Sequence, residues 1–194
     1  GKAKRTSIGA MHVMMNSELL NDVSDYSILR MKQDVFDRSN FGFIFVNKQT
    51  DGIGDLDSYN RSGGVDFSYS PTTDLNVMGF YSRTWDSVIG DADDAGFLQL
   101  RYSGSIYSAR LSYMNIEDNF EPAVGFVNRR RGLRALKRYL LEGSVRPRPR
   151  LMNIRTFFVR PRLRIFTTPD NQVKYWQGTF TTYTNFESGD WYRL

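Results

Sequence analysis

The chain has 194 residues, enough for one domain with a sizeable core, and no cysteine, which excludes disulfides, thiolate metal sites and cysteine nucleophiles. Mean hydropathy is −0.47, and no apolar run approaches the roughly 20 residues of a spanning helix, so a helical membrane protein is excluded. The net charge of +5 is uneven: 13 Lys or Arg and one acid, Glu142, lie between Arg129 and Arg164, whereas the remainder has 13 basic and 20 acidic residues. A basic block of this kind predicts a polyanion as partner, with nucleic acid as the first candidate.

Most of the chain alternates apolar and polar residues with a period of two, which predicts strands with one apolar and one polar face. In "GFLQLRYSG", for example, Leu98 and Leu100 alternate with Gln99 and Arg101. The predicted strands are 4–15, 25–34, 41–49, 62–70, 74–85, 95–103, 106–116, 131–145, 151–167 and 172–186. The segment 131–145 also has leucines at near-helical spacing, and strand is favoured there because its surroundings are strands.

The connections predict an up-and-down antiparallel meander whose loops alternate between long and short. About ten strands connected in this way are typical of all or part of a transmembrane β-barrel, so the fold class is all-β. A soluble barrel or long curved sheet is the competing structure, with its apolar face inward. The membrane is favoured by aromatic residues near predicted strand ends, which are suited to interfacial girdles: Tyr69, Tyr81, Trp85, Tyr102, Tyr107 and Tyr113.

The stretch "DNFEPAVGFVNRRR", 118–131, interrupts this pattern with Pro122, which stops strand pairing, and Gly125, which permits a bend. It predicts a long loop entering a basic strand, in which Asp118 and Asn119 cap backbone groups locally. Two interpretations stay open. The loop folds into the barrel as a constriction, or it is an ordinary ordered loop.

Three quoted stretches together resemble an uncharacterised family of Gram-negative outer-membrane proteins: "DNFEPAVGFVNRR", "YSILRMKQDVFDRSNFGFIFVNKQ" and "GGVDFSYSPTTDLNVMGFYSRT". In that family a family-9-type carbohydrate-binding module precedes a large domain that resembles a transmembrane β-barrel. The first shared pattern is met by Asn119, Phe120, Pro122, Gly125, Phe126 and Arg129. The second is met by Arg30, Asp34, Val35, Arg38, Ser39, Gly42, Asn47, Lys48 and Gln49.

The resemblance implies a location in the bacterial outer membrane and a barrel larger than this chain, of which residues 1–194 are expected to form a single, incomplete segment. The carbohydrate-binding module is absent from these residues. A link to carbohydrate binding or uptake, or a glycoside-processing activity, is therefore implied only by the family and has no residues here on which to rest.

Catalytic and metal-binding patterns are scarce, so we predict a non-enzyme without cofactor or metal. His12 is the only histidine and is expected to be packed or to face the lumen. The acidic runs "DGIGDLD" and "GDADDAG" do not have the spacing of an EF-hand, which leaves calcium binding by these loops open. Neither run supplies carboxylates that can be placed across a cleft as a glycosidase pair.

The basic residues Arg129, Arg130, Arg131, Arg155, Arg160, Arg162 and Arg164 have three interpretations: a nucleic-acid surface, a barrel wall facing the lumen or rim, and contact with acidic lipid headgroups. Strand periodicity in Arg160, Arg162 and Arg164 favours the wall over nucleic acid. The leading hypothesis is a porin-like outer-membrane barrel, acting as a pore or scaffold. Its partners are lipid and other outer-membrane or periplasmic proteins. A soluble or periplasmic sheet that binds polyanions is the alternative.

Overall fold

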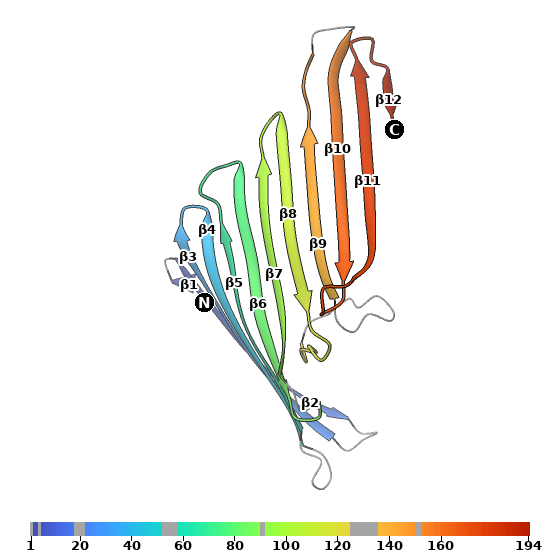
Figure 1. Cartoon of the computed structure of the whole chain (residues 1–194). Helices are drawn as coiled ribbons and strands as arrows, with labels where there is room; N and C mark the ends of the chain where they lie inside the picture. The colour runs from blue at the N-terminus through green and yellow to red at the C-terminus, as the bar shows by residue number, and fades with distance from the viewer. Residues whose placement is uncertain are drawn as a thin grey trace. The chain divides into compact units, whose positions relative to one another are not determined.

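The computed structural model describes residues 2–3, 5–17, 22–51, 58–89, 92–124, 136–149 and 153–194. They form one 12-stranded sheet in which each strand is hydrogen-bonded to its neighbours in the chain (Figure 1). The strands are β1 (Lys2–Ala3), β2 (Thr6–Ser17), β3 (Asp22–Phe36), β4 (Ser39–Asp51), β5 (Ser58–Tyr69), β6 (Leu75–Asp86), β7 (Ala92–Ser103), β8 (Tyr107–Ile116), β9 (Leu136–Val145), β10 (Ile154–Thr167), β11 (Val173–Phe186) and β12 (Trp191–Arg193).

The predicted all-β antiparallel meander is confirmed, and each of the ten predicted ranges overlaps one strand. The short β1 and β12 were not predicted. The helical alternative for 131–145 is wrong where the structure describes that segment, because 136–145 is β9. Within the described ranges there is no helix, and therefore none able to cross a bilayer.

The predicted alternation of longer and shorter connections is present, but most of the long ones are shorter than predicted because several strands continue into the predicted loops. The pairs Asn16↔Val23 and Ser17↔Asp22 carry the β2–β3 ladder to the edge of a connection that comprises only 18–21. Continued pairing satisfies backbone N–H and C=O groups whatever the side chains are, so polar residues do not end a strand by themselves. The longest interval between described strands is the one between Ile116 of β8 and Leu136 of β9.

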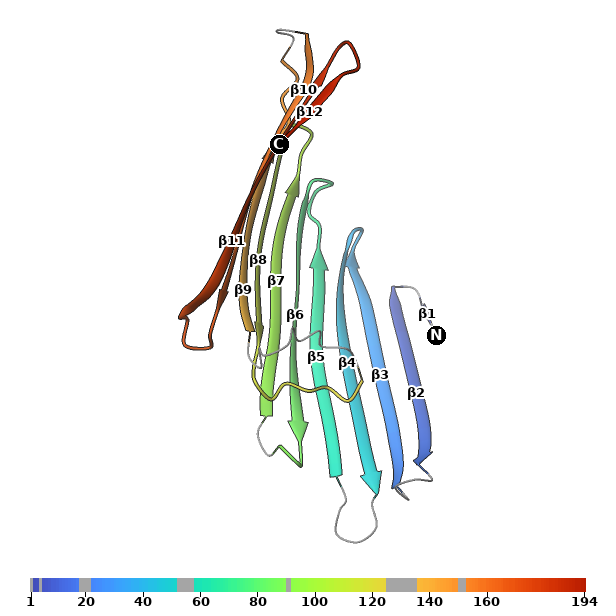
Figure 2. The same cartoon turned by 90° about the vertical axis from the view of Figure 1, so that its right-hand side faces the viewer.

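Contacts group the chain into two units. Unit 1 comprises Gly1–Tyr69, Met78–Phe97 and Asn115–Leu136, and it holds β1 to β5 with parts of β6 and β7. Unit 2 comprises Ser70–Val77, Leu98–Met114 and Lys137–Leu194, and it holds most of β8 and β9 with β10 to β12. Figure 2 shows the strands of each unit from a second direction.

In a sheet covered by a second layer, apolar side chains are buried and polar ones are exposed; here this pattern is reversed. In the described part of the chain the buried hydrophobic residues are Val46, Ala95 and Phe120. The buried polar residues are more numerous: Ser39, Asn60, Ser62, Thr84, Gln99 and Thr167. Large apolar side chains are exposed along nearly every strand, with Trp176 68% and Phe180 67% accessible.

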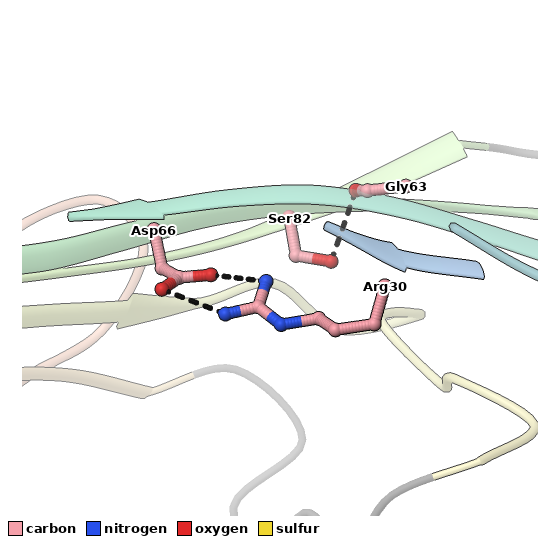
Figure 3. Close-up of polar contacts among 4 residues, drawn as sticks. All are labelled: Arg30, Gly63, Asp66 and Ser82. Atoms are coloured by element: carbon pink, nitrogen blue, oxygen red, sulfur yellow. Dashed lines mark hydrogen bonds and ion pairs between the residues drawn. The ribbon is translucent and has the colours of Figure 1, made fainter. Parts of the chain in front are cut away.

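An ion pair crosses the middle of unit 1. Arg30 on β3 donates from both Nη atoms to the carboxylate of Asp66 on β5, at 2.5 and 2.9 Å (Figure 3). The intervening strand β4 places Gly42 directly opposite Asp66. A Cβ atom at Gly42 would lie 2.5 Å from Arg30 Nη2 and 2.7 Å from Asp66 Oδ2, so any other residue there would displace these two groups. Beside it, the Ser82 hydroxyl donates to the Gly63 carbonyl at 3.1 Å.

The bridge predicts a coupled set of substitutions. Gly42→Ala should separate Arg30 from Asp66 and lower the free energy of unfolding by about 1–2 kcal/mol, because a half-exposed bidentate pair is lost while the side chains can move aside. Denaturant unfolding of Arg30→Met, Asp66→Asn and the double variant gives the coupling energy between the two residues. That coupling should fall towards zero in the Gly42→Ala background. An undiminished coupling there would show that Gly42 does not make room for the pair.

Candidate functional site

In unit 1, register assigns the side chains to two faces, because directly paired residues project to the same side of a sheet. The apolar face of unit 1 contains rows such as Ile8↔Met31↔Phe43↔Val65 and Ala10↔Leu29↔Phe45↔Gly63. The polar face of unit 1 contains Arg30, Asn60, Ser62, Asp66, Ser82 and Thr84 together with smaller apolar residues such as Val46. On β4 to β6 its members are the more buried ones, with Ser62 5% and Thr84 2% accessible. On β2 the same face carries Met11 and Met15, which are exposed.

Unit 2 has the same division. Its apolar face includes a groove of about 440 Å³, lined among others by Leu98, Leu100, Leu111, Tyr113, Tyr139, Leu141, Leu163 and Ile165. Its polar face includes Gln99, Arg101, Ser108, Arg110, Glu142, Ser144, Arg160, Arg162, Arg164, Gln177, Thr179 and Thr181. The predicted alternation of Leu98 and Leu100 with Gln99 and Arg101 agrees with this arrangement.

Most of the predicted girdle residues are exposed near strand ends. Tyr69 ends β5, Trp85 is next to the end of β6, and Tyr102 and Tyr107 flank the 104–106 turn. Tyr81 and Tyr113 are also exposed but lie within their strands. An exposed aromatic with a polar tip is suited to the boundary between an apolar and an aqueous medium.

The segment 117–124 lies over the polar face of unit 1, where Asn60 of β5 is hydrogen-bonded to it. The Asn60 amide group holds it on two sides, donating to the Glu121 carbonyl at 2.8 Å and accepting from the Ala123 backbone N–H at 2.9 Å. Between these two residues Pro122 has no N–H that would need a partner. In Figure 2 the segment, in yellow, passes across β6 and β5.

Two carboxylates complete the anchorage. Asp93 accepts from the Asn119 backbone N–H at 2.5 Å, and Asp86 accepts from the same Asn60 amide at 2.8 Å. Phe120, between the two anchor points, is 6% accessible. Asn119 is therefore held through its backbone N–H by a carboxylate on β7. Gly125, Phe126 and Arg129 of the same motif lie outside the described residues.

The predicted basic residues separate into three groups. Arg160, Arg162 and Arg164 share the polar face of unit 2, where Arg162 forms an ion pair with Glu142 on β9. Arg155 is exposed beside the register irregularity between Ile154 and Thr156, and it does not continue that row. The triple arginine 129–131 lies outside the described residues.

The sequence predicts that His12 is packed or faces the lumen, but the structure places it on the apolar face of unit 1. It lies on the same side as Ile8 and Ala10, exposed, with its Nδ1 3.0 Å from the Ser27 hydroxyl. Among the described residues there is no cluster of His, Cys, Asp or Glu that could hold a metal ion. Asp93 and Asp94 of the acidic run instead contact Asn119 and Arg83.

Comparison with models of known families, with curated proteins and with solved structures finds no match for this chain. The residues of the site consequently have to be interpreted from their chemistry. Asn60, Asp86 and Asp93, which hold the 117–124 segment, were not predicted. In the sequence they resemble the polar residues that are common in turns and at strand ends. No local pattern indicates that Asn60 contacts a residue more than sixty positions away.

The anchorage predicts how the segment can be released. Asn60→Ala removes two hydrogen bonds to 117–124, and with Asp93→Ala it removes a third, so hydrogen exchange at the Ala123 and Asn119 amides should accelerate by about tenfold or more. Exchange is followed by mass spectrometry. The matched control is Asn47→Ala, which removes one hydrogen bond to Arg61 on the opposite face. Equal acceleration in the control would contradict a specific anchorage.

Proposed function

We propose that this chain is part of a bacterial outer-membrane β-barrel whose apolar face contacts lipid and whose polar face lines the lumen, with a pore or scaffold role rather than an enzymatic one. The observation that supports it most directly is the reversed burial: large apolar side chains are exposed, whereas serine, threonine and asparagine are buried. A soluble sheet with this pattern would present a continuous apolar surface to water, which is strongly unfavourable. In a bilayer the same surface is the stable one.

The charge distribution supports the same orientation. A cation at the lipid-facing midplane of a barrel costs about 2–4 kcal/mol. Arg30, Arg160, Arg162 and Arg164 all lie on the polar faces, and Arg30 and Arg162 have carboxylate partners there. In a barrel, the 117–124 segment would lie inside the lumen and narrow it.

Sidedness can be tested with single-cysteine variants, since the chain has no native cysteine. Spin labels at Leu100 and Phe43 should be more accessible to oxygen, which partitions into lipid. Labels at Arg101 and Ser62 should be more accessible to a water-soluble nickel chelate. The measurement is power-saturation EPR of the protein in vesicles. Nickel accessibility at Leu100 and Phe43 equal to that at Arg101 would support the soluble alternative.

The lumenal position of the segment gives a separate prediction for a conducting form. Deletion of 118–123, or Asn60→Ala combined with Asp93→Ala, should raise the single-channel conductance in a planar bilayer, because the segment no longer narrows the lumen. Asn47→Ala is again the control and should leave conductance unchanged. A conductance that is identical in all variants would place the segment outside the path of the ions.

A further inference from the structure

Three rows of side chains meet on the polar face of unit 2, at the β8, β9 and β10 strands. The pairs Val159↔Val145 and Arg162↔Glu142 share one register, which places Ser144 opposite Arg160. On the other side of Ser144, its hydroxyl is 2.7 Å from the hydroxyl of Ser108 on β8. Ser108, Ser144 and Arg160 therefore occupy neighbouring positions on one face across three strands.

A second guanidinium comes from Arg146, directly after β9. Its Cζ atom lies 5.2 Å from the centre of the Phe158 ring, and that of Arg160 lies 5.7 Å from the same centre. Two guanidinium groups thus form cation–π contacts with the Phe158 ring on the polar face, because the π face of the ring is partially negative. The ring fixes both groups without neutralising either.

Among the described residues neither Arg146 nor Arg160 forms an ion pair. Glu142, the one acid in the strands of unit 2, is bound to Arg162. On the same face, in β7 and β8, the Nε atoms of Arg101 and Arg110 are buried without a hydrogen-bond partner among the described residues. This region therefore has donors and positive charge in excess of its acceptors.

We propose that Arg146, Arg160, Ser108 and Ser144 form a binding site for a phosphate-type oxyanion. Guanidinium groups bind oxyanions through paired N–H donors, and the two hydroxyl groups supply further donors beside them. A tetrahedral anion has enough acceptor oxygens for both arginines and a serine at once, which a halide does not. The inference goes beyond the barrel proposal and does not require that a pore be open.

The test is the binding of inorganic phosphate to the whole chain in neutral detergent at constant ionic strength, measured by calorimetry and by ³¹P line broadening. Arg146→Gln and Arg160→Gln should each weaken binding by about tenfold or more, and Ser144→Ala by less, since a hydrogen bond to a charged group is stronger than one between neutral groups. Sulfate should compete with phosphate, and chloride should not. Circular dichroism reports whether each variant keeps its sheet.

Arg155→Gln is the matched control, because it makes the same charge change on the same strand at an exposed position away from the site. Phosphate binding that is unchanged in Arg146→Gln combined with Arg160→Gln, or reduced as much in Arg155→Gln, would overturn the site. Tight binding of a single-stranded oligonucleotide with a steep salt dependence, unaffected by sulfate, would do the same and favour a nucleic-acid surface.

A second arm distinguishes free phosphate from a lipid headgroup. Mixed micelles containing phosphatidylglycerol should displace phosphate, in a manner that depends on Arg160, only if the site takes a headgroup. No displacement assigns the site to free phosphate. The EPR accessibility of labels at Leu100 and Arg101 is measured without phosphate. A result that contradicts the barrel proposal is therefore distinct from a result that contradicts the phosphate site.

Discussion

The rest of the structure depends on one continuous antiparallel ladder, in which each strand finds its backbone partners in its immediate chain neighbours. Side chains alternate between the faces of such a ladder, so once the pairing is set, the placement of every strand residue follows. A slip of one residue between β3 and β4 would exchange Arg30 and Lys32 with Leu29 and Met31. The register is therefore what keeps the charges together on one side.

A sheet that is one layer thick has to stabilise its polar face with its own residues. In unit 1 this is done by the Arg30–Asp66 bridge over Gly42 and by the 117–124 segment, which covers Asn60 and brings in Phe120. The ion pair and the 117–124 segment both connect strands that are not adjacent in the sheet. They therefore add long-range contacts to a topology whose backbone pairing is otherwise local.

The strands and their faces were predictable because alternation is a local property of the sequence, visible within about ten residues. Strand ends were less predictable, since pairing continued through polar residues such as Asn16 and Ser17. The anchorage of 117–124 was beyond local patterns, because Asn60 and Ala123 are 63 residues apart in the sequence. Gly42 and Arg30 belong to the same sequence motif. The structure gives the reason: the Arg30 guanidinium and the Asp66 carboxylate meet over Gly42, in the space that a side chain at this position would fill.

The basic polar face of unit 2 follows from the same geometry. Alternate residues on one strand are about 7 Å apart, so Arg160, Arg162 and Arg164 repel one another by only about 0.6 kcal/mol per neighbouring pair in water. The repulsion grows several-fold where the effective dielectric constant falls towards that of a protein surface. One acid, Glu142, offsets one of these charges. A face built in this way is stable beside water or bound anions and unstable beside hydrocarbon, whereas the leucines and aromatics behind it have the opposite preference. The sheet is thus suited to a boundary between two media.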